Sequence, residues 1–176
     1  MRGKIKYLTL SAVFTALICV GAWIKIPFII PVTLQFFFVN TAILSQKPKY
    51  AVLSIAVYIF MGLIGIPVFS SGGGITYVFT PSFGYLIGFL AAAFLSVFIK
   101  NKKHIYIQSF LNIFIIYLFG LFYFYLISHL YINTDISISK LLVTGFLIFI
   151  PSDLVSIFLS CAAVKYLRRL GFVQEI

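Results

Sequence analysis

Six long apolar runs, separated by short polar connections, constrain the fold of this chain more than any other feature. A helix needs about 20 mostly apolar residues to cross the hydrocarbon core of a bilayer, and it satisfies its own backbone hydrogen bonds there. The pattern therefore predicts an all-α integral membrane protein: one domain, residues 1–176, built as a six-transmembrane-helix bundle. The predicted spans are about 7–26, 32–46, 50–66, 82–99, 105–128 and 138–167.

Composition agrees with a membrane protein and argues against most soluble classes. Hydrophobic residues make up 62% of the chain and charged residues only 9%. A net charge of +10 would suggest nucleic acid in a soluble protein, but the basic residues here lie between the apolar runs. We therefore expect membrane lipid as the surroundings and no nucleic-acid partner. Because Cys19 and Cys161 both lie inside apolar runs, we expect neither a disulfide nor a metal site.

Basic residues are distributed unequally between alternate connections. Eleven of the 13 Lys and Arg lie at the N-terminus, in the 47–49 and 100–103 turns, and near the C-terminus, whereas Lys25 and Lys140 lie in the other connections. Lys and Arg concentrate on the cytoplasmic side of membrane proteins. The count predicts a multi-pass protein of the cell membrane with both termini cytoplasmic. It also predicts substantial outer loops between the first and second spans and between the third and fourth.

The stretch 66–89 contains the most unusual of these outer connections. Its middle holds Gly72, Gly73 and Gly74 together with serines, threonines and prolines, and it carries no charge. Glycine takes positive φ without strain and lets backbone approach a ligand closely. We expect a folded-back loop that, with the 27–35 loop, roofs a pocket in the outer half of the bundle. A plain surface connection is the alternative.

Asp153 is the only acid deep within an apolar run, about midway along the sixth. A carboxylate there costs at least about 2.5 kcal/mol on insertion scales, so it should face the bundle interior and have a polar partner. Ser156 and Ser160 follow at i+3 and i+7 on the same helix face. Pro151 interrupts the helical hydrogen bonds and frees a carbonyl near Leu147. We interpret Asp153 as a binding residue; a structural acid bonded to a neighbouring helix is the alternative.

Other polar or small residues within the runs are weaker candidates. Gln35 ends the first outer connection, and Asn40 and Asn112 lie in the second and fifth runs. For Asn40 and Asn112, hydrogen bonding between helices is the commoner role of such a residue, and ligand binding is the alternative. Ala12 and Ala16 in the first run are four residues apart, a spacing that lets another helix approach closely.

Known enzyme templates do not match the chain. Acid pairs for metal-dependent hydrolysis or proteolysis need a second deep carboxylate beside Asp153, and His104 and His129 lie at opposite ends of the fifth run. The chain has no nucleotide-binding signature. We therefore expect no catalytic residue, no metal and no cofactor, and a small-molecule transporter or receptor with an outward-facing site.

Three ordered motifs carry a family resemblance. They are IPFIIPVTLQ at 26–35, GLIGIPVFSSGGG followed by TPSFGYLIGF at 62–89, and PSDL at 151–154. They resemble, in this order, the first outer loop, the glycine loop with the fourth helix, and the P-G-D-L of the last helix in the BioY family, the biotin-binding S components of energy-coupling factor (ECF) transporters. The resemblance implies a subunit that captures biotin from outside. It also implies an ECF transmembrane coupling subunit and two ATPase subunits as partners.

The resemblance assigns roles to individual residues. It places the ureido ring of biotin at Asp153, and it puts Ser156 where the family usually has a lysine. It matches Ala12 and Ala16 to the family's A-x-x-x-A face, which docks the coupling subunit. The substrate-binding candidates are Asp153, Ser156, Gln35, Asn40, Gly72, Gly73, Gly74, Tyr77, Phe83, Tyr85 and Asn112.

Two other functions remain open at this point. One is an S component for another vitamin, such as thiamin or riboflavin. The other is a membrane enzyme acting on lipid, which the missing second carboxylate disfavours.

Overall fold

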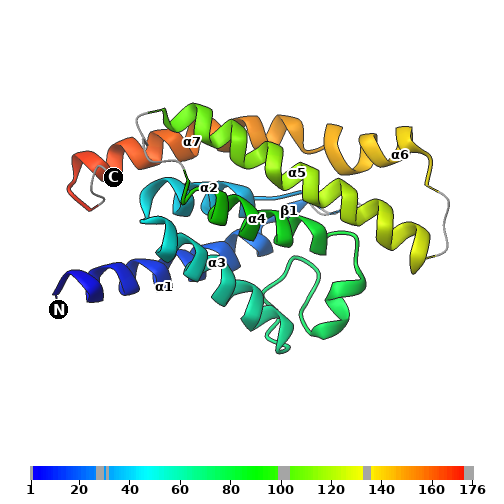
Figure 1. Ribbon diagram of the computed structural model, residues 1–176, viewed down its shortest axis with the longest axis horizontal. Coiled ribbons are helices and arrows are strands. Elements are labelled where there is room, and N and C mark those ends of the chain that lie inside the picture. Colours follow the sequence, from blue (N-terminus) through cyan, green and yellow to red (C-terminus); the bar gives the residue numbers. More distant parts are fainter. Residues whose placement is uncertain (1, 27–29, 31, 99–103, 133–135, 173–176) are drawn as a thin grey trace.

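A computed structural model describes residues 2–26, 30, 32–98, 104–132 and 136–172 (Figure 1). In chain order the elements are α1 (Arg2–Trp23), β1 (Lys25–Ile26), β2 (Val32–Thr33), α2 (Gln35–Ser45), α3 (Pro48–Leu63), the 3-10 turn η1 (Ile75–Phe79), α4 (Phe83–Leu95), α5 (Ile105–Leu130), α6 (Ile138–Leu142), the π-helical turn η2 (Val143–Leu147) and α7 (Ile150–Arg169). The last three of these, α6, η2 and α7, follow one another as a single helical run.

The six helical runs close into a ring. Helix α1 packs against α2 and α3, α3 against α4, α4 against α5, α5 against α7, and α7 against α2 (Figure 1). Both labelled chain ends lie at one end of the molecule, and α6 lies at the other. Within the described residues, three helices are long and apolar enough to cross a membrane: Lys4–Trp23, Ile105–Leu130 and Ile138–Arg169.

The predicted runs all appear as helices, but their ends and lengths need correction. The largest shift is at the first run, which was predicted to start at residue 7 and starts at Arg2. Three of the helices are short: α2, α3 and α4 have 11, 16 and 13 residues. The turn at 100–103 and most of 27–31, predicted as a cytoplasmic turn and as part of the pocket roof, lie outside the described residues.

A short antiparallel hairpin corrects the purely helical prediction. Lys25 pairs with Thr33 and Ile26 with Val32, although these residues were assigned to the ends of the first two spans. Two prolines lie between the strands in sequence. Because proline is poorly tolerated inside helices and restricts the residue before it to extended backbone, the chain leaves the helical conformation here.

Glycines let α4 and α5 pack with their backbones close together. A Cβ atom added to Gly88 would lie 2.8 Å from the Cα of Ile116, and one added to Gly84 would lie 2.3 Å from the Cβ of Tyr123. In the opposite direction, a Cβ on Gly120 would overlap the ring of Tyr85. Small residues at such contacts are typical of helix association in lipid, where packing rather than hydrophobic burial provides the attraction.

A cluster of buried polar side chains joins α2, α5 and α7. The Asn40 amide nitrogen donates to the hydroxyls of Ser109 at 2.9 Å and Ser160 at 2.7 Å, and its oxygen accepts from Asn112 at 2.9 Å. All four side chains are buried. Since every bond crosses between helices, this cluster fixes the lateral arrangement of the three helices.

We predict that Gly88→Ala lowers the thermal stability of the purified protein in detergent. Helix propensity alone would make alanine about 1 kcal/mol more favourable than glycine, so a loss of stability has to come from the Ile116 backbone contact. Overpacking of this kind costs about 1–3 kcal/mol. Ala162→Leu, a larger change at an exposed position of α7, is the control. A higher midpoint for Gly88→Ala would mean that α4 and α5 do not approach this closely.

Candidate ligand-binding pocket

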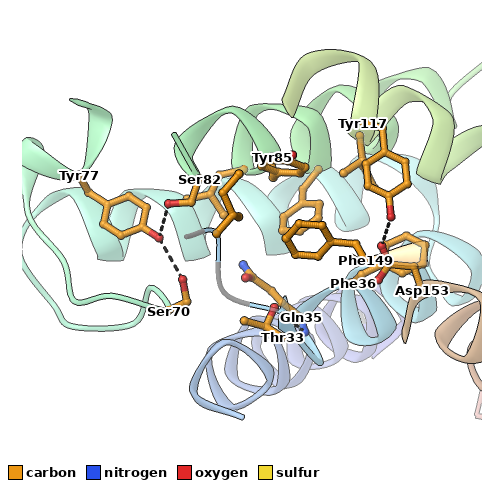
Figure 2. A pocket seen from close by; sticks show the side chains of 14 residues that line it. Thr33, Gln35, Phe36, Ser70, Tyr77, Ser82, Tyr85, Tyr117, Phe149 and Asp153 are labelled. Atoms are coloured by element: carbon orange, nitrogen blue, oxygen red, sulfur yellow. Dashed lines mark hydrogen bonds between the residues drawn. The ribbon is translucent and has the colours of Figure 1, made fainter. Parts of the chain in front are cut away.

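A pocket opens among α2, α4, α5, α7, the hairpin and the loop that follows α3 (Figure 2). The volume of the cavity within these walls is about 60 Å³. Among its lining residues Asp153 is the only acid, and there is no basic residue. The lining residues are Ile30, Thr33, Gln35, Phe36, Ser70, Tyr77, Ser82, Tyr85, Leu86, Phe89, Ile116, Tyr117, Phe149 and Asp153.

One end of the pocket holds a carboxylate that is hydrogen-bonded to a tyrosine. Asp153 is 8% exposed, and its Oδ2 atom accepts a 2.5 Å hydrogen bond from the Tyr117 hydroxyl (Figure 2). The side chain of the preceding residue, Ser152, also interacts with this carboxylate, whose two oxygens together offer about four acceptor sites, so part of its acceptor capacity is free. A carboxylate in this state can receive N–H groups from a ligand.

The π-helical turn η2 explains how Tyr85 comes to form a wall of this end. In an α-helix the carbonyl of Gly145 would accept from the amide of Phe149, but that amide bonds to Phe146 instead. The free carbonyl accepts a 2.6 Å hydrogen bond from the Tyr85 hydroxyl. The ring of Tyr85 therefore lines the pocket while its hydroxyl is already occupied. The carbonyl with a side-chain partner is thus that of Gly145, freed by the π-helical turn, and not the one near Leu147 that Pro151 was expected to free.

Aromatic side chains form the middle of the pocket. Phe36 from α2, Phe89 and Tyr85 from α4 and Phe149 before α7 lie between the two polar ends, as Figure 2 shows for those it labels. The rings of Tyr85 and Phe149 are 5.9 Å apart, centroid to centroid. Such a lining contacts apolar rings or chains of a ligand.

Hydroxyl groups form the other end. Ser82 donates to the Tyr77 hydroxyl at 3.0 Å, and that hydroxyl shares a 3.1 Å hydrogen bond with Ser70 (Figure 2). Gln35 lies nearby, with its amide nitrogen donating to Tyr58 at 2.8 Å. The pocket thus has an anionic end at Asp153 and a neutral, hydroxyl-rich end.

The three consecutive glycines shape the loop that carries the hydroxyl end. Gly72 and Gly74 have φ values of +118° and +105°, and a Cβ on Gly73 would lie 2.3 Å from a carbonyl oxygen earlier in the loop. The loop is folded back, as predicted. Its glycines do not line the pocket themselves; they make the turn that places Ser70 and Tyr77.

Four predicted binding residues come together in the pocket: Gln35, Tyr77, Tyr85 and Asp153. The other predictions lie elsewhere. Asn40 and Asn112 bond to each other in the cluster between helices. Ser156 is buried on α7 but is not part of the lining, and the ring of Phe83 lies 5.8 Å from that of Tyr123.

Sequence reasoning missed several of the lining residues. Tyr117 is the most important of these, and the one signal for it was the need of Asp153 for a donor from a neighbouring helix. Phe69, which lies in the same loop as Ser70, packs between Tyr58 and Tyr77 rather than into the pocket. The other missed residues are Ile30, Thr33, Phe36, Ser70, Ser82, Leu86, Phe89, Ile116 and Phe149.

A separate apolar groove lies between α1 and α3. Ala12 and Ala16 are exposed in it, beside Leu53 and Val57. The hydroxyl of the neighbouring Thr15 donates to a carbonyl of α3 at 3.0 Å, so this hydroxyl is already bonded and the groove stays apolar at Thr15. Figure 1 shows the two helices on the side of the ring away from α5.

Comparison with known proteins gives consistent matches along the chain. A family model described as the BioY family matches residues 1–171. The probable biotin transporter BioY of Lysinibacillus sphaericus is 40% identical over 153 residues, which are 83% of this chain and 78% of that protein. The biotin transporter BioY of Thermotoga maritima is 34% identical over 166 residues, 91% of this chain and 94% of that protein.

A solved structure matches as well. It is the 2.1 Å crystal structure of the S-component for biotin from an ECF-type ABC transporter, with a TM-score of 0.74 and 31% identity over 96% of this chain and 93% of that one. Transporter relatives and three helices able to cross a bilayer make this chain a multi-pass membrane protein. Because the family model covers almost the whole chain, the chain belongs to the BioY family.

Proposed function

We propose that this chain is the biotin-specific S component of an ECF-type transporter, a binding subunit and not an enzyme. The observation that carries the proposal is the pocket with one buried carboxylate, Asp153, at the end of an aromatic lining. Relatives named as biotin transporters and a neighbour described as an S-component for biotin support the choice of ligand.

The Asp153 end suits the ureido ring of biotin. Tyr117 occupies one side of the Oδ2 atom, and the remaining lone pairs of the carboxylate accept the ureido N–H groups. A hydrogen bond to a charged acceptor contributes about 1.5–3 kcal/mol. The tyrosine bond keeps the carboxylate in one orientation, so little of this free energy is lost in ordering it.

The aromatic middle suits the fused ring and the hydrocarbon tail of the vitamin. Phe36, Phe89 and Phe149 provide apolar surface, and the Tyr85 ring adds to it while its hydroxyl is held by Gly145. Burial of apolar surface contributes about 25 cal/mol per Å² before the costs of binding. A mostly apolar lining with a few well-placed hydrogen-bonding groups is the usual form of a small-molecule pocket.

Orientation and partners follow from charge and from the α1–α3 groove. The charge count supports cytoplasmic termini, and both termini lie at one end of the molecule (Figure 1), as an even number of crossings requires. The pocket then opens outward through the hairpin and the glycine loop. The exposed Ala12–Ala16 face supports docking of a transmembrane coupling subunit, which two ATPase subunits would drive.

We predict that Asp153→Asn lowers biotin affinity about 10- to 100-fold in the purified, detergent-solubilised protein, measured by calorimetric titration. Asparagine keeps the shape but turns an N–H donor toward the ureido N–H groups. Tyr117→Phe should cause a smaller loss, because it removes only the group that holds the carboxylate. Tyr125→Phe, the same change at an exposed position of α5, is the control.

Size-exclusion chromatography of each variant separates loss of binding from loss of folding. Thiamin and riboflavin, titrated into the wild type, test the other vitamins. Unchanged biotin affinity in folded Asp153→Asn would place the ureido ring elsewhere, and tighter binding of another vitamin would change the substrate.

A second prediction concerns transport. Ala12→Leu with Ala16→Leu should reduce biotin uptake by cells that contain the whole transporter, because leucine prevents a close approach of helices. Biotin binding by the isolated double variant should be unchanged, since neither residue lines the pocket. Ala162→Leu on the opposite side of the ring is the control. Normal uptake in the double variant would show that this face docks no partner.

A further inference from the structure

The hydroxyl end of the pocket has a hydrogen-bond donor to spare. Ser82 gives its proton to the Tyr77 oxygen, and Tyr77 and Ser70 share a single bond of 3.1 Å. The hydroxyls of Tyr77 and Ser70 therefore have two protons for one bond. No described residue accepts the second proton. Both side chains line the pocket, at 5% and 8% exposure, so water in bulk does not reach them freely.

A buried donor without an acceptor is costly, and such groups in folded proteins are normally satisfied. The spare proton therefore calls for an acceptor that enters the pocket. Whichever of the two hydroxyls donates to the other, the remaining one points to the same kind of ligand atom, an oxygen or nitrogen acceptor.

A positive charge lies beside this spare donor. The ammonium group of Lys25 donates a hydrogen bond to the backbone carbonyl of Ser70. In the hairpin Lys25 is directly opposite Thr33, so the two side chains emerge on the same face, and Thr33 lines the pocket. Lys25 itself is exposed and does not line the pocket. The geometry puts its charge at the mouth, next to the Ser70–Tyr77 pair.

A negative charge thus lies at one end of the pocket, and a positive charge lies outside the lining beside the other. Asp153 repels an anionic group from its end, whereas Lys25 attracts one to the mouth. A ligand with N–H donors at one end and a carboxylate at the other therefore has one favoured orientation. We infer that Lys25 and the Ser70–Tyr77 hydroxyl pair recognise the carboxylate of the substrate, an inference that rests on the proposed binding of biotin.

A structural role for Lys25 gives a different expectation. If the lysine only connects the hairpin to the loop through the Ser70 carbonyl, its loss lowers the affinity for every ligand of the pocket alike. If it recognises a carboxylate, its loss lowers the affinity for the acid and leaves the affinity for the amide unchanged. Biotin and biotinamide, which differ only at the carboxyl group, separate the two roles.

The experiment is a titration of purified wild type and Lys25→Met with biotin and with biotinamide. We expect Lys25→Met to lower the affinity for biotin about tenfold or more and to change the affinity for biotinamide by no more than about twofold. Lys140→Met, a change of the same kind on α6, should alter neither affinity, because Lys140 does not line the pocket and its described hydrogen bonds are to Ser137 and Thr144, which do not line it either. Tyr77→Phe, which removes one hydroxyl of the pair, should weaken the binding of biotin more than that of biotinamide.

Salt provides a second readout. Wild-type affinity for biotin should fall as ionic strength rises, and the affinity of Lys25→Met should respond less, because exposed charges are screened. Equal losses for the acid and the amide, or no loss for either, would overturn the inference while leaving biotin binding intact. A wild type that binds no biotin would instead overturn the proposed function and the inference with it.

Discussion

The hydrogen bond between Tyr117 and Asp153 is the contact on which the pocket depends. A carboxylate inside a membrane domain needs a donor, and this one obtains it from the facing helix, so that α5 and α7 are held together at the deep end of the pocket. The π-helical turn just before α7 adds a second tie, from Gly145 to Tyr85 on α4. One acid and one irregular turn thus define the positions of three walls.

The polar cluster around Asn40 supports this arrangement from the side of the chain termini. Along α5, Ser109 and Asn112 come before Tyr117, and along α7, Ser160 follows Asp153, so the cluster joins the same helices farther from the pocket opening. Its hydrogen bonds are satisfied within the chain, whereas the Asp153 carboxylate and the Ser70–Tyr77 pair retain capacity. The difference separates polar groups that hold the fold from polar groups that await a ligand.

Sequence reasoning located the helices and Asp153 because both give strong local signals, long apolar runs and an isolated charge within one of them. It kept Asn40 and Asn112 as binding candidates beside the bonds between helices that they in fact make, because polarity in a span does not tell whether a side chain faces a pocket or another amide. The need of Asp153 for a donor was the one signal for Tyr117, and it could not single out this residue among the 11 tyrosines of the chain. The hairpin has two residues in each strand, too few for a periodic pattern, and the role of the glycines in placing Ser70 depends on contacts distant in the chain.

A structure of the protein with biotin bound would show directly whether Asp153 holds the vitamin. We expect the ureido nitrogens within hydrogen-bond distance of the Asp153 carboxylate, with Tyr117 still donating to Oδ2 and the rings of Phe36 and Phe149 against the vitamin. Biotin outside this pocket, or bound in it with the ureido ring away from Asp153, would mean that this carboxylate is not the binding group.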